Sequence, residues 1–248
     1  MKKRLPISAR GRNAAKRLQR TPSVTTTVSG NPDPATGSCT GAEPNAQAML
    51  KLSASTLTLE GSWQQNDPAS LDHDFGSTPT LFDATIGGVH RSLVGAVNKN
   101  GVFYAFDRSN VAAGPVWTYR VADTGASPEE GQGAIAPAAF DGTSLYIGGG
   151  QLGSCPAELA ALDPATGIAQ WSDCVDGPII GGVAEAPGLL AVGAGPNLEV
   201  FSSSTGIQLR TPLYDGDPAW YFSVPTISNG KILIAKTTGL VEAFAPGP

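Results

Sequence analysis

Residues 159–171 read LAALDPATGIAQW, and residues 198–210, LEVFSSSTGIQLR, repeat the same pattern. In both stretches a short apolar run leads through a polar residue to a Thr-Gly step and a second short run. The glycine supplies the positive φ that such a turn needs, so each stretch predicts two antiparallel strands joined at Thr-Gly. The shared offsets predict a repeated unit rather than an isolated hairpin. Trp117 and Trp171 close strands of this unit and are expected to pack between repeats.

Three more copies of this unit are less complete. Residues 102–116 and 240–244 keep part of the pattern, and residues 50–63, LKLSASTLTLEGSW, keep both runs without the turn glycine. Further strand pairs are predicted between the copies, and two of them turn at an Asn-Gly step, which is a strong hairpin signal. These pairs span residues 92–106, 138–147, 183–192 and 224–234.

The spacing of the copies predicts the fold. Corresponding strand ends lie 39 residues apart from Leu162 to Phe201, 43 from Phe201 to Phe244, and 56 from Phe106 to Leu162. Four short strands in each stretch of roughly 40–45 residues are typical of β-propeller blades, whereas a β-sandwich does not repeat Thr-Gly at fixed offsets. The sequence therefore predicts an all-β partial ring of about five four-stranded antiparallel blades over residues 24–248.

The composition excludes several function classes. Charged residues make up 15% of the chain, while 31 Gly and 20 Pro suit short strands and tight turns rather than helices. The first 20 residues hold eight of the 16 Lys and Arg and no acidic residue, so the remainder has eight bases against 21 acids. An acidic body argues against nucleic acid as a partner. No run approaches the roughly 18 apolar residues that a membrane-spanning helix needs.

The basic head, residues 1–23, is predicted to be a disordered tail outside the propeller. Its first 20 residues, MKKRLPISARGRNAAKRLQR, contain no apolar segment after the charges, so they do not form a secretory signal peptide. A transit-like peptide is the alternative, because the segment is rich in Arg and lacks acids.

The chain has three cysteines, Cys39, Cys155 and Cys174. The last two bracket a predicted strand-turn-strand unit, so a hairpin can bring them together as a disulfide, which would indicate an oxidising compartment. Two buried free thiols are the alternative. Cys39 is then the odd cysteine, and the wide spacing does not match a zinc site.

Two stretches of the chain resemble the pyrroloquinoline quinone (PQQ) dependent alcohol dehydrogenases: residues 74–82, DFGSTPTLF, and residues 98–108, NKNGVFYAFDR. That family forms propellers of eight blades, and the match falls on its C-terminal part and covers most of residues 24–248. The resemblance implies part of a ring, which a second chain would complete, and a periplasmic or extracellular location.

The resemblance implies a site made from three residues. Asn31, in a Gly-Asn-Pro step, matches an amide ligand of calcium, and Asp74 matches the catalytic carboxylate, which also binds the metal. Arg108 matches the arginine that contacts the quinone oxygens. We expect all three to face one central cavity, because the inner strand ends of propeller blades converge on the axis. The structural alternatives are a turn cap for Asn31, a solvated loop carboxylate for Asp74 and a local ion pair for Arg108.

These residue types suit the oxidation of an alcohol, which removes a hydroxyl proton and a hydride. A carboxylate can take the proton as general base, calcium can polarise the quinone carbonyl, and a guanidinium can stabilise the developing negative charge. The resemblance thus implies PQQ and calcium as cofactors, a small alcohol as substrate and a cytochrome as electron acceptor. Gly76 stands where lanthanide-dependent relatives carry a second Asp, so calcium is the expected metal.

Other parts of the family's site have no match in this chain. The family's metal-binding Glu and quinone-stacking Trp precede the Gly-Asn-Pro step, where this chain has the basic head, and the adjacent-cysteine disulfide is absent. We therefore expect the isolated chain to hold PQQ poorly, as an enzyme completed by other blades or as a truncated fragment. The alternative function is a non-catalytic propeller that binds proteins, similar to the assembly lipoprotein of bacterial outer membranes.

Overall fold

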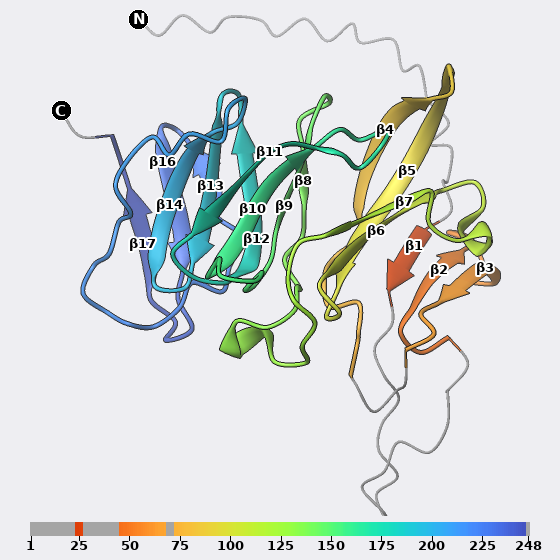
Figure 1. Ribbon diagram of the computed structural model, residues 1–248, viewed down its shortest axis with the longest axis horizontal. Coiled ribbons are helices and arrows are strands. Elements are labelled where there is room, and N and C mark those ends of the chain that lie inside the picture. Colours follow the sequence, from red (N-terminus) through yellow and green to blue (C-terminus); the bar gives the residue numbers. More distant parts are fainter. Residues whose placement is uncertain (1–22, 27–44, 68–71, 247–248) are drawn as a thin grey trace, which may run out of the picture.

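The computed structural model describes residues 23–26, 45–67 and 72–246, which form five antiparallel sheets in chain order (Figure 1). The predicted all-β partial propeller of about five blades is confirmed. Residues 1–22, which make up nearly all of the predicted basic head, lie outside the described residues.

Each sheet is called a blade and is numbered along the chain. Blade 1 comprises β1 (Ser23–Thr26), β2 (Ala48–Leu52) and β3 (Leu59–Gln64), and blade 2 comprises β4 (Thr80–Ile86), β5 (Val89–Asn98), β6 (Val102–Asp107) and β7 (Trp117–Arg120). Blade 3 comprises β8 (Ala139–Phe140), β9 (Leu145–Gly148), β10 (Ala157–Leu162) and β11 (Ala169–Val175). Blade 4 comprises β12 (Ile179–Ala186), β13 (Leu189–Ala194) and β14 (Asn197–Ser202), and blade 5 comprises β15 (Thr226–Ser228), β16 (Lys231–Ala235) and β17 (Val241–Phe244).

The predicted strand count is correct for only part of the molecule. Blades 2 and 3 have four strands, whereas the other three blades have three strands each among the described residues. In blade 4 the backbone of a fourth segment pairs with β14 through isolated bridges, of Leu198 with Leu213 and of Phe201 with Gln208. The two bridges are out of register, because three residues separate them on β14 and five separate them on the segment, so no continuous ladder forms there.

The two complete Thr-Gly turns form as predicted after the third strand of blades 3 and 4. Gly167 N donates to Asp163 O over 2.8 Å, and Gly206 N donates to Ser202 O over 2.9 Å, with φ of 70° and 72° for the two glycines. In blade 1 the same bond runs from Leu57 N to Ser53 O over 2.8 Å. The incomplete copy at residues 50–63 is therefore a true repeat, with a leucine in the turn position.

Four apolar cores fill the spaces between consecutive blades, and an indole closes each of the first three. Trp63 packs against the core of blades 1 and 2, Trp117 against that of blades 2 and 3, and Trp171 against that of blades 3 and 4. Nε1 of Trp117 donates to Pro164 O, and Nε1 of Trp171 to the turn carbonyl Ser203 O, both over 3.0 Å. The expectation that Trp117 and Trp171 pack between blades is confirmed.

The two cysteines of blade 3 form the predicted disulfide. Cys155 lies in the β9–β10 loop and Cys174 on β11, with their Cα atoms 5.5 Å apart. The alternative of two free thiols is thus wrong for the structure, and Cys39 lies outside the described residues.

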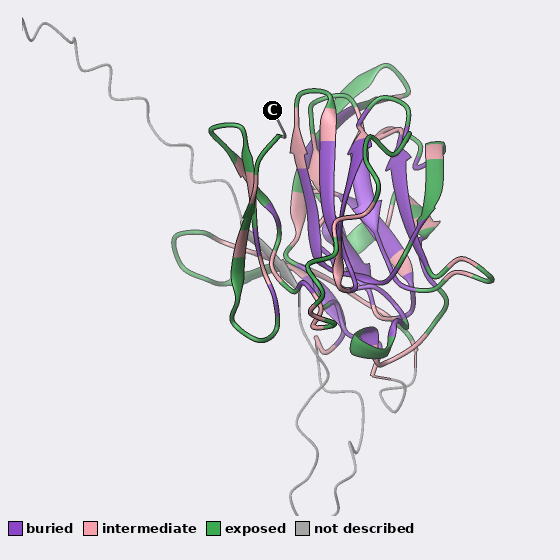
Figure 2. Ribbon diagram, turned by 90° about the vertical axis from the view of Figure 1, so that its left-hand side faces the viewer, coloured by how far each residue is buried: buried purple, intermediate pink, exposed green. Residues whose placement is uncertain are grey.

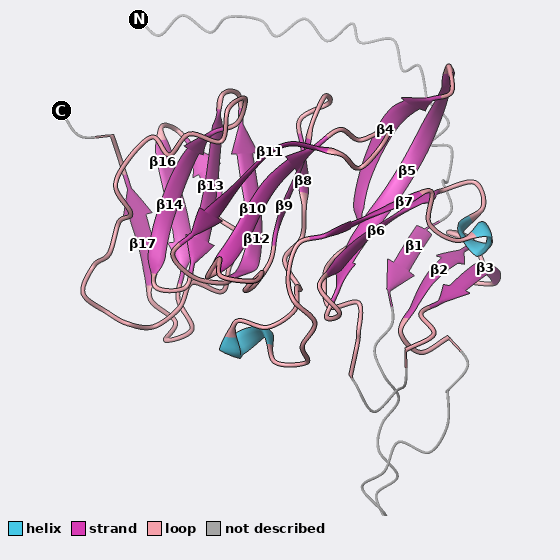
Figure 3. Ribbon diagram, viewed as in Figure 1, coloured by secondary structure: helices cyan, strands magenta, loops and turns pink. Residues whose placement is uncertain are grey.

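Strands and loops make up nearly all of the described chain (Figure 3). The helices among the described residues are two short 3-10 turns, η2 (Val111–Ala113) and η3 (Pro128–Glu130). Neither approaches the length and apolarity that a membrane crossing requires of a helix. Buried residues concentrate in the central blades, whereas blade 5 is mostly half-buried or exposed (Figure 2).

Candidate functional site

Asp74 lies in the loop between β3 and β4, beside the β5–β6 turn of blade 2. Its side chain is largely buried, and its backbone carbonyl accepts a 2.9 Å hydrogen bond from Lys99 N in that turn. The Lys99 ammonium lies 3.4 Å from Asp74 Oδ2 and 2.8 Å from Asp72 Oδ2. One cation thus bridges two carboxylates at one end of blade 2, which we call the Asp74–Lys99 cluster.

The charges in this cluster stabilise one another. Burial lowers the pKa of Lys99, but the hydrogen bond and charge of Asp72, with the charge of Asp74, outweigh it and leave the pKa above its usual value. Burial raises the pKa of Asp72, but hydrogen bonds to Lys99 and Asp74 and the Lys99 charge bring it below its usual value. Lys99 is therefore a full cation, and Asp72 is ionised, at neutral pH.

A buried polar network holds the loop against the turn. His73 Nδ1 lies 2.7 Å from Asp67 Oδ2, and Asn98 Nδ2 donates to His73 O over 2.6 Å. Asn100 Nδ2 donates to Tyr104 Oη over 2.7 Å, below the turn. Because buried polar groups bonded in this way are costly to separate, the network fixes where Asp74 and Lys99 sit.

The structure does not bring Arg108 to this cluster. Arg108 follows β6, and its backbone N–H donates to Ser92 O near the start of β5. Six residues of extended strand separate Arg108 from the turn that touches Asp74, a span of roughly 20 Å. The structure therefore places Asp74 and Arg108 at opposite ends of blade 2, because the chain reverses once more between them. Asn31, the third predicted residue, lies outside the described residues.

Lys99 is the residue that sequence reasoning missed, and a count of strands would have found it. In an antiparallel blade the chain returns to the same end after an even number of strands. Two strands, β4 and β5, separate Asp74 from Lys99, whereas three strands separate Asp74 from Arg108. The residue types of the turn at residues 98–101 indicate a hairpin and nothing about a site. Lys99, within this turn, nevertheless lies at the same end of blade 2 as Asp74.

The two predicted Asn-Gly turns differ in backbone conformation. Gly101 has a φ of 81°, and its N–H donates to Asn98 O over 2.9 Å, so glycine alone takes the left-handed position there. At the second predicted Asn-Gly turn both Asn229 and Gly230 have positive φ, at 50° and 70°. The longer first turn leaves room for Lys99 at its tip.

The donor set of the cluster suits a ligand with electron-rich oxygens. A carboxylate next to an ammonium can accept a proton while the ammonium stabilises nearby negative charge. The described residues are less suited to calcium, which takes roughly six to eight oxygen ligands. Within the described ranges no group of three or more His, Cys, Asp or Glu could hold a metal ion, and Lys99 already occupies the space between the carboxylates. Gly76 has no room for a further ligand, since a Cβ there would lie 2.5 Å from Ile135 Cγ2.

Comparison with known proteins supports the fold and goes no further. No family model and no curated protein matches the chain. Quinohemoprotein alcohol dehydrogenase from Comamonas testosteroni is similar in structure, with a TM-score of 0.65 and 16% identity over 87% of this chain and 42% of that one. BamB from Moraxella catarrhalis is also similar, with a TM-score of 0.54 and 15% identity, and the match covers 80% of this chain and 52% of BamB. Sqt1 from Saccharomyces cerevisiae has a TM-score of 0.58 and 13% identity, and the match covers 81% of this chain and 54% of Sqt1.

At these identities the likeness shows a β-propeller and nothing more specific, because propellers serve both dehydrogenases and non-catalytic scaffolds. The chain spans between two fifths and about half of the length of each of these proteins.

Proposed function

We propose that the chain is part of a PQQ-dependent alcohol dehydrogenase propeller in which Lys99, rather than Arg108, is the cation of the quinone site. The observation that carries this proposal is the 3.4 Å approach of Lys99 Nζ to Asp74 Oδ2 at one end of blade 2. It supplies the carboxylate and the cation that alcohol oxidation needs, side by side and held by a buried network.

Each residue of the cluster has a defined role in this proposal. Asp74 would accept the hydroxyl proton of a small alcohol, and Lys99 would stabilise negative charge on an adjacent oxygen. Asp72 would hold Lys99 in place through their 2.8 Å ion pair. PQQ, when bound, would supply the acceptor for the hydride. No step is assigned to calcium, since its proposed ligand Asn31 lies outside the described residues.

The surroundings of the enzyme belong to the same proposal. Further blades, from this protein or from a second chain, would complete the ring, and a cytochrome would take the electrons. The Cys155–Cys174 disulfide supports a periplasmic or extracellular location, because such bonds persist in oxidising compartments.

A second candidate is a non-catalytic scaffold that binds proteins. The observation in its favour is that Asp74 is only 7% exposed and ion-paired, whereas a general base must reach its substrate. The displaced Arg108 also removes one of the two described residues on which the dehydrogenase prediction rested.

The proposal is tested by mapping where PQQ binds. In an NMR titration of the isotope-labelled chain with PQQ, with and without calcium, the amide resonances of residues 72–76 and 98–101 should shift. Binding should be weak but detectable, with a Kd no larger than about 1 mM. The variant Lys99→Gln, which removes the cation, should weaken binding at least about tenfold, and Asp83→Asn, on the exposed edge of blade 2, should not. Shifts confined to other blades, or none at millimolar PQQ, would favour the scaffold.

A further inference from the structure

The space between blades 4 and 5 differs from the three before it. There the core consists of Ala191, Leu198, Tyr221 and Ile234 with partly buried neighbours, and no indole of the described chain closes it. In the earlier blades Trp117 lies opposite Ala105, and Trp171 lies opposite Ala161, on the fourth strand. The Thr-Gly alignment puts Trp171 four residues after Gly167, and Arg210 four residues after Gly206. Arg210 thus stands where blades 2 and 3 have tryptophan.

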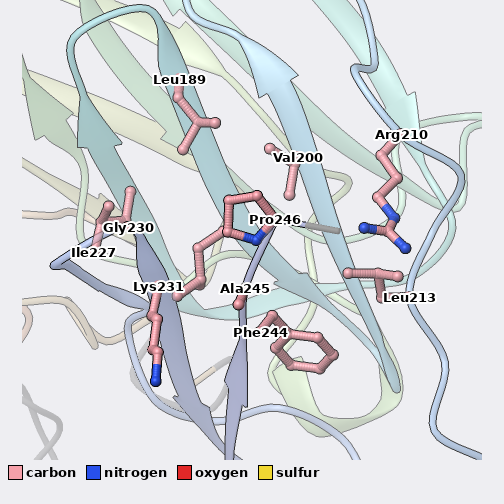
Figure 4. A pocket seen from close by; sticks show the side chains of 11 residues that line it. Leu189, Val200, Arg210, Leu213, Ile227, Gly230, Lys231, Phe244, Ala245 and Pro246 are labelled. Carbon is pink, nitrogen blue, oxygen red and sulfur yellow. The ribbon is translucent and has the colours of Figure 1, made fainter. Parts of the chain in front are cut away.

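An apolar groove of about 280 Å³ lies at this position (Figure 4). Leu189, Val200 and Leu213 of blade 4 line one part of it. Ile232 and Phe244 of blade 5 line another. Its volume is near the lower end of the range for ligand pockets, which suits one large side chain better than a drug-sized molecule. The groove is the place that an indole fills between the preceding blades.

The rim of the groove is positively charged on an otherwise acidic molecule. Arg210 and Lys231, both exposed, lie on opposite sides of Pro246 in the view of Figure 4. The end of β17 runs beside the groove, since Phe244, Ala245 and Pro246 line it. In the described residues β17 is also the edge of its sheet, and edge strands are templates for an added strand.

We propose that this groove binds an extended segment of a partner protein that carries one aromatic side chain flanked by acidic residues. The aromatic ring fills the apolar groove as Trp63, Trp117 and Trp171 do between the other blades. The flanking carboxylates meet Arg210 and Lys231, and the segment's backbone pairs with β17. This proposal does not rest on the Asp74–Lys99 cluster, which belongs to blade 2.

The probe is a nine-residue synthetic peptide of alternating Thr and Val, with Trp at its centre and Glu two residues to either side. Calorimetric titration of the full chain should show saturable binding. Replacing the peptide's Trp with Ala, or its Glu residues with Lys, should weaken binding at least about tenfold, because the ring is the anchor and the charges are complementary.

The decisive variant is Arg210→Trp, which restores the indole of the other blades and fills the groove. It should abolish peptide binding and raise the melting temperature. Leu209→Trp is the matched control, since Leu209 is 54% exposed on the same segment and does not line the groove; it should leave binding within about twofold. Arg210→Ala, which keeps the groove open, should weaken the acidic peptide about tenfold and a Glu-to-Gln peptide far less.

Three results would overturn the proposal. The first is no saturable binding at millimolar peptide, and the second is binding that Arg210→Trp leaves intact. The third is a concentration-dependent dimer, seen by light scattering, that Arg210→Trp abolishes, because a second copy of the chain would then be the occupant.

Discussion

Leu57 shows how a single residue can oppose the fold that surrounds it. It occupies the turn position that Gly167 and Gly206 hold in later blades, with a φ of 59° and 73% of its surface exposed. A left-handed backbone brings the Cβ of an L-residue close to the following carbonyl, which costs roughly 1–2 kcal/mol. The hydrogen bond from Leu57 N to Ser53 O keeps the turn closed in spite of this strain.

The variant Leu57→Gly should therefore stabilise the protein by about 1 kcal/mol, since glycine takes this conformation freely and the exposed side chain contributes little burial. Urea unfolding followed by fluorescence measures the change. Leu59→Gly is the matched control, because Leu59 is 52% exposed but lies in β3, and glycine there should destabilise. A loss of stability in Leu57→Gly would contradict the idea of a strained turn.

The Asp74–Lys99 cluster shows what residue types alone can and cannot predict. The resemblance around Asp74 predicts that it is a site residue, and the structure places it in a buried position beside Lys99. The resemblance implies Arg108 as the cation of the site. Lysine can supply a cation as well, so position decides which residue lies beside Asp74. Lys99 is the cation in contact with Asp74, because the two strands between them bring the chain back to the same end of the blade.

At the scale of elements, the repeated contact is between the Thr-Gly turn of one blade and the tryptophan ring of the blade before it. A Cβ added to Gly167 would lie 2.4 Å from Trp117, and one added to Gly206 would lie 2.6 Å from Trp171. The turn glycine is thus needed twice, for its positive φ and for the close approach of the ring. The sequence signal is strong for this reason, and the strand pairs on either side can be predicted with it.

The variant Gly206→Ala should destabilise the protein by about 2–4 kcal/mol, the sum of backbone strain and a clash with Trp171. Gly188→Ala is the control for strain alone, because Gly188 has a φ of 86° and no atom within 4 Å of its added Cβ. It should cost about 1 kcal/mol. Equal losses in the two variants, measured by thermal or urea unfolding, would show that the indole does not press on the turn.

The number of strands in each blade is harder to predict than their existence. The weak fourth segment of blade 4 makes only isolated bridges to β14, and these are two residues out of register with each other. Strand propensity gives no warning of this, because it depends on what the outer segment can pack against. In the first three blade pairs an indole supplies that packing.

On the scale of the whole molecule, the blades form an open series whose cohesion comes from the cores between neighbours. In the described part of the chain each apolar core lies between two neighbouring blades, as in other repeat proteins, so the cores can differ in strength along the chain. The core between blades 4 and 5 is small, and blade 5 is the most exposed sheet in Figure 2. We infer that local unfolding begins in blade 5.

The two ends of blade 2 carry different charged groups. One end holds the Asp74–Lys99 cluster, and the other holds Arg108 at the close of β6. The sequence predicted the blades, but it did not predict which ends of the strands lie together, because that follows from counting reversals along the whole chain. The proposed function requires that the site lie at the end of blade 2 that holds Asp74 and Lys99.

The most direct test is therefore a comparison of two cation variants in the PQQ titration. Lys99→Gln should weaken PQQ binding at least about tenfold and remove the shifts at residues 98–101, because it deletes the cation beside Asp74. Arg108→Gln, at the opposite end of blade 2, should leave the affinity unchanged. If Arg108→Gln abolished binding while Lys99→Gln retained it, the site would lie at the other end of the blade, and Lys99 would not be the cation of the quinone site.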